Sequence, residues 1–199
     1  MSHNRSHDSS PSLPSLTRRP WALALGFLFA SFSLTSLPSK AQTRLHLPAT
    51  VAQAIAEMDR LCRDVGGQPA SGPELLRSMD LNGDGVPDYA LDQGAYFCDG
   101  AASLFSGSGG SQLVVWASNG PGALVTKVFD GGHFGIKVDA EHKARARLLL
   151  ALRGAQCGQK VAPQTANSDL QFCWRPLNWD PKRKLLQLAP LSEIRPYEQ

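Results

Sequence analysis

The sequence has 199 residues, of which 42% are hydrophobic and 19% are charged, with 18 glycines, 14 prolines and four cysteines. This composition excludes collagen-like, coiled-coil and disulfide-dense miniprotein classes, and it supplies enough apolar side chains for a folded core. The formal net charge is +3, but residues 1–41 contain four basic side chains and one acidic side chain. Residues 42–199 therefore carry equal numbers of both, with no basic surplus to bind nucleic acid or anionic lipid.

Residues 1–41 have the pattern of an export signal. Two arginines precede an apolar run over residues 21–34, and Ser39 and Ala41 provide the small residues of a cleavage site. The run is too short to span a bilayer, which needs about 20 apolar residues. We predict that residues 1–41 are a signal peptide with a disordered n-region. Residues 42–199 are then a single domain without a membrane span, which is periplasmic or secreted.

All four cysteines lie in the predicted exported domain, and none belongs to a Cys-x-x-Cys motif. Export brings them into an oxidising compartment, which favours two disulfides over a zinc site or free reactive thiols. Four cysteines allow three pairings. We favour Cys62 with Cys98 and Cys157 with Cys173, because these pairs close the shorter loops.

One strong helix is predicted near the start of this domain. Apolar residues recur there at steps of three and four: Val51, Ile55, Met58, Cys62 and Val65. Thr50 is the expected N-cap, and Gly66 with Gly67 is expected to end the helix.

Turn residues recur about every 8–12 positions after this helix, which is typical of β structure. We expect strands at residues 75–80, 89–91, 112–118, 124–129, 134–138, 145–152, 171–174 and 184–188. The composition of residues 145–152 would also suit a helix, but glycine-bearing turns on both sides favour a strand. The predicted fold is α+β, with one N-terminal helix packed on a mainly antiparallel sheet and stapled by disulfides.

Residues 80–88, Asp-Leu-Asn-Gly-Asp-Gly-Val-Pro-Asp, form the most informative motif, called the 80–88 loop below. Oxygen-bearing groups stand at intervals of two along it: Asp80, Asn82, Asp84, the Val86 carbonyl and Asp88. If the loop curls, these oxygens converge on one cation, and Gly85 permits the sharp turn. Carboxylates and an amide favour Ca²⁺ over zinc, copper or magnesium. The alternative is a metal-free Asn-Gly/Asp-Gly turn.

This motif resembles the Asp-x-Asn-x-Asp-Gly calcium loops of EF-hands, dockerins, thrombospondin type 3 repeats and integrin-type propeller blades. An EF-hand has a bidentate Glu at loop position twelve, where this chain has Leu91. The flanking residues alternate as strands do, so the resemblance is to the propeller-blade type and implies a structural calcium ion. The motif occurs once, and Asp92 is predicted to be a further ligand or a partner of one. Residues 80–110 also resemble exported bacterial proteins without an assigned activity.

These observations predict a calcium-stabilised, non-catalytic exported protein that acts as a binding or interaction module, with an envelope protein or a glycan as partner. The alternative is a secreted hydrolase with a site around His133 and the loop that begins at Ser106 and ends at Gly110. The turn sequence around His133 favours an exposed histidine. A pocket joining His133 to a loop serine or a carboxylate would favour the hydrolase, whereas a flat face bearing Trp179 would favour binding.

Overall fold

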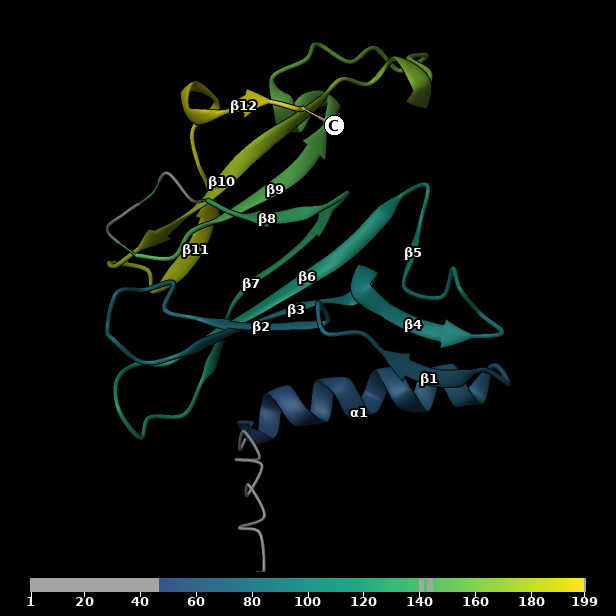
Figure 1. Cartoon of the computed structure of the whole chain (residues 1–199). Coiled ribbons are helices and arrows are strands. Elements are labelled where there is room, and N and C mark those ends of the chain that lie inside the picture. Colours follow the sequence, from purple (N-terminus) through teal and green to yellow (C-terminus); the bar gives the residue numbers. More distant parts are fainter. Residues whose placement is uncertain (1–46, 140–141, 143–144, 199) are drawn as a thin grey trace, which may run out of the picture. The chain divides into compact units, whose positions relative to one another are not determined.

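The computed structural model describes residues 47–139, 142 and 145–198 (Figure 1). All of them lie in the second of the two units into which the chain divides, Arg44–Gln199. The predicted signal peptide lies outside the described residues. Within the described part, no helix is long and apolar enough to cross a membrane.

The predicted helix is present as α1 (Ala49–Asp64), and it buries Val51, Met58 and Cys62 on one face. The expected N-cap at Thr50 is wrong, because the helix begins one residue earlier, with Pro48 as its N-cap. The Pro48 carbonyl accepts the first helical hydrogen bonds, and its ring fixes φ at a value that leads into a helix.

Every predicted strand has an observed counterpart, although the boundaries differ. The strands are β1 (Gln68–Ser71), β2 (Leu76–Met79), β3 (Asp88–Asp92), β4 (Tyr96–Asp99), β5 (Ser106–Gly107), β6 (Gly110–Ala117), β7 (Thr126–His133), β8 (Ile136–Val138), β9 (Leu148–Arg153), β10 (Phe172–Asp180), β11 (Leu185–Leu188) and β12 (Arg195–Pro196). Short 3₁₀ helices are η1 (Gln93–Ala95), η2 (Gly154–Cys157), η3 (Asn167–Asp169) and η4 (Leu191–Glu193). The sequence missed β1, β4, β5 and β12, which are too short for a clear alternating pattern.

The strands form three antiparallel sheets, where one sheet was expected. The first sheet has the order β2-β3-β6-β5, with β7 also paired to β6. The second sheet has the order β11-β10-β9-β8, with β12 also paired to β10. Strands β1 and β4 form a separate two-stranded ribbon. The α+β class is therefore confirmed, but the single sheet is not.

The main core lies between the two five-stranded sheets, because their apolar faces pack against each other. The first sheet and its loops contribute Leu81, Ala90, Leu113, Val115, Ala117 and Val128, and the second contributes Leu148, Leu150, Leu152, Cys173, Leu177 and Leu186. On the other face of β9, Leu149 and Ala151 cluster with Trp174. Burial on both faces explains why the segment around β9 is apolar throughout and is a strand.

Helix α1 and the β1–β4 ribbon pack against the other face of the first sheet, where Val51 and Met58 join Leu91 and Trp116 in a second apolar cluster (Figure 1). The Cys62–Cys98 disulfide joins α1 to β4. The Tyr96 hydroxyl donates a hydrogen bond to Asp59 over 2.8 Å. Burial, reinforced by this hydrogen bond, raises the pKa of Tyr96 to about 12, so the hydroxyl stays protonated at neutral pH.

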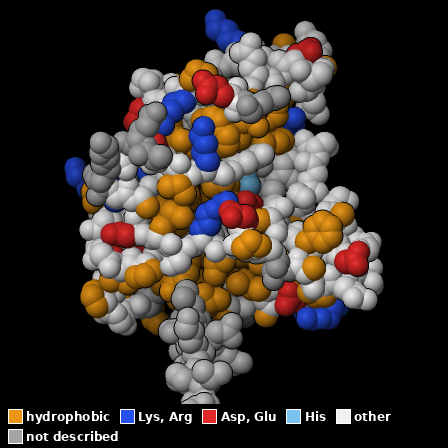
Figure 2. All heavy atoms as spheres, in the orientation of Figure 1, with side chains coloured by type: hydrophobic (Ala, Val, Ile, Leu, Met, Phe, Trp, Pro, Cys, Tyr) orange, Lys and Arg blue, Asp and Glu red, His pale blue; other side chains and the backbone are white. Residues whose placement is uncertain are grey.

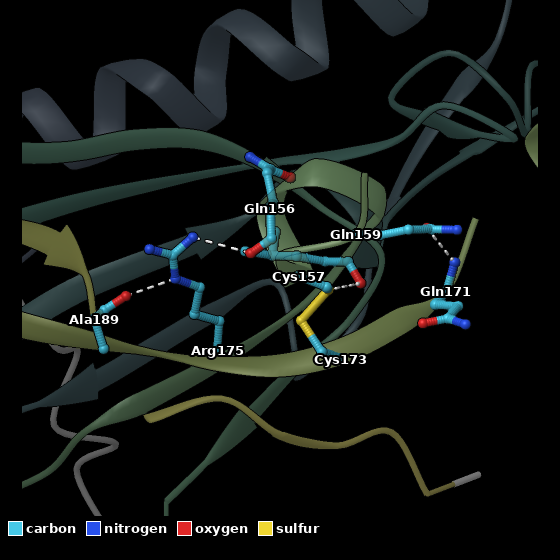
Figure 3. Close-up of a disulfide and its surroundings, with 8 residues drawn as sticks. Gln156, Cys157, Gln159, Gln171, Cys173, Arg175 and Ala189 are labelled. Atoms are coloured by element: carbon cyan, nitrogen blue, oxygen red, sulfur yellow. Dashed lines mark hydrogen bonds between the residues drawn. A yellow bond between two sulfur atoms is a disulfide. The ribbon is translucent and has the colours of Figure 1, made fainter. Parts of the chain in front are cut away.

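The second disulfide, Cys157–Cys173, joins η2 to β10 (Figure 3). Beside it, the Arg175 guanidinium donates hydrogen bonds to the carbonyls of Gln156 and Ala189, over 2.9 and 2.6 Å. Both predicted pairings are confirmed, and no cysteine is left free.

Candidate functional site

The 80–88 loop joins β2 to β3, as the alternating flanks predicted, and Met79 pairs with Asp88 at its base. Two glycines give the loop its curvature, because Gly83 and Gly85 have φ values of 84° and 78°. An L-residue with a side chain rarely adopts such angles. The positive φ angles therefore turn the loop sharply at both glycines.

Three side chains of the loop accept hydrogen bonds from the loop's own backbone. Asp80 accepts from the amides of Gly83 and Gly85, over 2.6 and 3.0 Å. Asn82 Oδ1 accepts from the Asp84 amide over 2.9 Å, and Asp84 Oδ1 accepts from the Val86 amide over 2.8 Å. These bonds fix the orientation of the three side chains, and each accepting oxygen has a further lone pair for another partner.

Asp88 is fully buried at the base of the loop. Its carboxylate accepts hydrogen bonds from the amides of Leu81, Asn82 and Ser118, over 2.8, 3.1 and 2.9 Å. Burial raises the pKa of Asp88, and the neighbouring charge of Asp84 raises it further, although the three hydrogen bonds oppose the shift. Asp84 is exposed; desolvation acts to raise its pKa, but hydrogen bonds from Val86, Ser118 and Asn82 outweigh this and lower that pKa.

The loop carboxylates are bonded to amides and are not gathered around one point. Among the residues that the structure describes, no three His, Cys, Asp or Glu side chains are grouped as metal ligands. The loop therefore keeps the oxygen-bearing residues of the calcium motif, and calcium binding stays a prediction.

Asp92 lies apart from this loop. It is the last residue of β3, whereas Asp88 is the first, so about 13 Å of extended chain separates them. Its Oδ1 lies 3.2 Å from His133 Nε2, and its Oδ2 lies 3.8 Å from Arg77 Nη1. The prediction that Asp92 completes the calcium shell is therefore corrected, because an extended strand carries its side chain to the opposite end of the first sheet.

His133 is the last residue of β7 and is only 3% exposed, in contrast to the exposed turn histidine that the sequence favoured. Strand register explains its burial. Ser111 pairs with both Ser106 and His133, and Asp92 pairs with Leu113, two residues further along β6. Side chains in such register point to the same face of a sheet, which here is the face of the main core.

The side chains of Asp92 and His133 meet over β6. Their strands flank β6 on its two sides and are therefore about 10 Å apart. The side chain of Ser111, which lies on β6 between them, is small enough to leave space for this contact. Gly94 packs against Ser111 and Asp92. A Cβ on Gly94 would lie 2.9 Å from Ser111 Oγ and 3.1 Å from Asp92 Oδ1.

A cavity of about 260 Å³ opens beside this pair, and we call it the His133 cavity. Its lining consists of Asp92, Ser106, Ser111, His133, Phe134, four glycines and Ala95. It adjoins a more polar groove of about 500 Å³ along residues 103–112, and the two share Ser106, Gly107, Gly110 and Ser111. The structure thus joins His133 to a loop serine and a carboxylate in one concave site.

The His133 ring is unpaired in hydrogen-bonding terms. Neither ring nitrogen has a hydrogen-bond partner among the described residues, and both are buried. Nε2 lies 3.2 Å from Asp92 Oδ1, but without the alignment of a hydrogen bond. An unsatisfied buried polar group costs about 1–3 kcal/mol, so a buried histidine of this kind points to a missing partner.

Sequence patterns missed Ser111 as a site residue and misplaced Asp92. Ser111 and Asp92 lie on the face of the main core, two positions from Leu113 and Ala90, but residues 113–117 are apolar on both faces of β6 and show no alternation that would mark this face. Trp179, the residue expected on an exposed face, lies in β10 and packs partly buried against the main core. On the face shown in Figure 2, acidic and basic side chains are scattered among hydrophobic ones, as the balanced charge predicted.

No known protein family, curated protein or solved structure matches this chain. The 80–88 loop and the His133 cavity are therefore the features from which we infer a function.

Proposed function

We propose that the protein is an exported, non-catalytic interaction module that is stabilised by a calcium ion in the 80–88 loop. The observation that supports calcium most directly is the curled loop, in which backbone amides orient the oxygens of Asp80, Asn82 and Asp84. The two disulfides support export, because such bonds persist in oxidising compartments.

Electrostatics also favour a cation at this loop. The charge of Asp84 contributes to the raised pKa of Asp88, so the two carboxylates are close enough to repel each other. A divalent ion would neutralise that repulsion.

Arg145 lies beside the loop, and a Cβ built on Gly83 would be 3.8 Å from the Cδ of Arg145. Its positive charge opposes a bound cation, so Arg145→Gln should tighten calcium binding.

Chelation of calcium should lower the melting temperature by a few degrees. A dissociation constant of about 10⁻⁴ M, at about 1 mM free calcium, corresponds to about 1.4 kcal/mol of stabilisation. Asp84→Ala should abolish this response, whereas Asp92→Asn should retain it, because Asp92 lies at the other end of β3. Thermal melting with and without chelator, and titration calorimetry of the chelated protein, provide the measurements.

Magnesium at the same concentration should restore little of the lost stability, because its octahedral shell gives up water reluctantly. If adding calcium to the chelated protein gave neither heat nor a shift in melting temperature, the 80–88 loop would be an ordinary turn.

Hydrolysis at the His133 cavity is a second candidate function, and the cavity meets the criterion set for it in the sequence analysis. The observation that favours hydrolysis is the cavity itself, which brings His133, Asp92 and Ser106 together. The interaction module is preferred because, among the described residues, neither ring nitrogen of His133 bonds a serine hydroxyl, as the base of a serine nucleophile would. Release of p-nitrophenol from p-nitrophenyl acetate is a suitable assay, with Ser106→Ala and His133→Gln expected to reduce turnover to the uncatalysed rate. Ser108→Ala is the matched control, because Ser108 lines the adjoining groove but not the cavity. A wild-type rate equal to the blank would exclude this candidate.

A further inference from the structure

We propose that the His133 cavity binds one ring of a neutral saccharide. This inference names the ligand class of the interaction module and so rests on that proposed function, but it does not require the calcium ion. The observations behind it are the unpartnered polar atoms of the cavity, the balance of charge around Asp92, and the size and lining of the space.

The cavity contains unpartnered polar atoms. Both ring nitrogens of His133 are buried without a hydrogen-bond partner among the described residues, and a ligand hydroxyl, which both donates and accepts, can bond to either of them. Ser111 donates its hydroxyl hydrogen to the Phe105 carbonyl over 3.0 Å, so its oxygen remains an acceptor. Such a site requires a ligand that presents several hydrogen-bonding groups, and the hydroxyl groups of a sugar meet this requirement.

Charge selects against ionised ligands. The Arg77 guanidinium lies 3.8 Å from Asp92 and is also paired with Glu74, so it opposes a cation that would approach Asp92. The Asp92 carboxylate in turn repels an anion. An uncharged ligand meets no like charge at either Arg77 or Asp92.

Size and lining suit one ring. Pockets for drug-sized ligands occupy about 300–1,000 Å³, and this cavity has about 260 Å³. Phe134, whose ring has the Arg153 guanidinium 4.4 Å from its centroid, adds an aromatic side chain to the lining for contact with the C–H groups of a sugar. The glycines let the ligand approach the backbone, and the adjoining groove along residues 103–112 offers a path for a longer chain.

The test uses the purified, ¹⁵N-labelled exported protein and three sugars that share one ring. N-acetylglucosamine is the neutral probe, glucosamine is the cationic analogue and glucuronate is the anionic one. We expect N-acetylglucosamine to shift the amide resonances of Gly94, Ser111 and His133, with binding at least about tenfold tighter than that of either charged analogue. Absence of shifts at tens of millimolar sugar would overturn the proposal and leave a buried water as the partner of His133.

Two variants locate the binding. Gly94→Ala places a Cβ against Ser111 and Asp92 and should weaken binding of N-acetylglucosamine by about tenfold or more. Gly109→Ala is the matched control, since a Cβ there meets nothing within 4 Å and Gly109 does not line the cavity. Equal binding by both variants would overturn the proposal.

Asp92→Asn tests the charge argument without filling the cavity, and it remains informative if Gly94→Ala does not fold. It should let glucuronate bind beside Arg77, at least as tightly as the neutral sugar. Unchanged selectivity would contradict the role given to Asp92. Each titration is repeated with calcium and with chelator, so a protein that responds to calcium but not to sugar refutes only this inference.

Discussion

Replacing Asp139 by Asn should lower the free energy of unfolding by about 3 kcal/mol, because it leaves two guanidinium groups without their shared carboxylate. The Asp139 side chain is fully buried between Arg147 and Arg195. Arg147 Nη2 lies 2.6 Å from Asp139 Oδ2, and two nitrogens of Arg195 donate hydrogen bonds to the same carboxylate over 2.9 and 3.0 Å. Arg147 precedes β9 and Arg195 begins β12, so one carboxylate ties together three segments of the second sheet. Urea denaturation of both proteins at neutral pH measures the loss.

Acid should remove the same stabilisation in the wild type. Burial acts to raise the pKa of Asp139, but hydrogen bonds and charge from Arg147 and Arg195 outweigh it and lower that pKa below its usual value of 3.8. A carboxyl whose pKa is lower in the folded state contributes stability above its unfolded pKa. That contribution is lost as pH falls below about 4 and through the folded pKa. The variant should therefore lose less stability on acidification than the wild type does.

Asp130→Asn is the matched control for both measurements. Its pKa is also lowered, chiefly by hydrogen bonds from Lys127 and Gln112, but the Lys127–Asp130 pair is exposed. Surface pairs of this kind contribute about 1 kcal/mol or less. If Asp139→Asn lowered the free energy of unfolding no more than Asp130→Asn does, the buried cluster would not stabilise the second sheet as its geometry indicates.

Loss of the Cys62–Cys98 disulfide should cost a similar amount, about 3–4 kcal/mol from chain entropy alone. The bond closes a loop of 36 residues and joins α1 to β4. The double variant Cys62→Ser/Cys98→Ser removes it without leaving a free thiol. Denaturant titration should give the difference in stability, and amide exchange should be fastest in α1, which then depends on apolar packing and the Tyr96–Asp59 hydrogen bond.

The Cys157→Ser/Cys173→Ser variant provides the comparison, with a sequence separation of 16 and an expected cost of about 3 kcal/mol. Labelling of the wild type with a thiol reagent, under denaturing and non-reducing conditions, should give no modified cysteine. Uptake of two labels per chain would contradict the pairing, and identical stability with and without reductant would contradict the predicted energetic role.

Much of this fold could be predicted because its determinants are local. The apolar stripe from Val51 to Cys62 specifies α1, and turn residues at short intervals separate the strands. Cysteine spacing together with an oxidising compartment pointed to both disulfides. Two glycines and alternating oxygens were enough to recognise the 80–88 loop, because its hydrogen bonds join residues only two to five positions apart.

The division into two sheets and the His133 cavity depend on contacts between residues far apart in the chain. Asp92, Ser111 and His133 lie at the ends of different strands, and only the registers of β3 and β7 on β6 bring them to one inward face. A shift of one residue in either pairing would turn the corresponding side chain to the opposite face. Register depends on the packing of the whole core, so local sequence patterns placed Asp92 near the 80–88 loop and His133 in solvent, and the tertiary structure instead joined them.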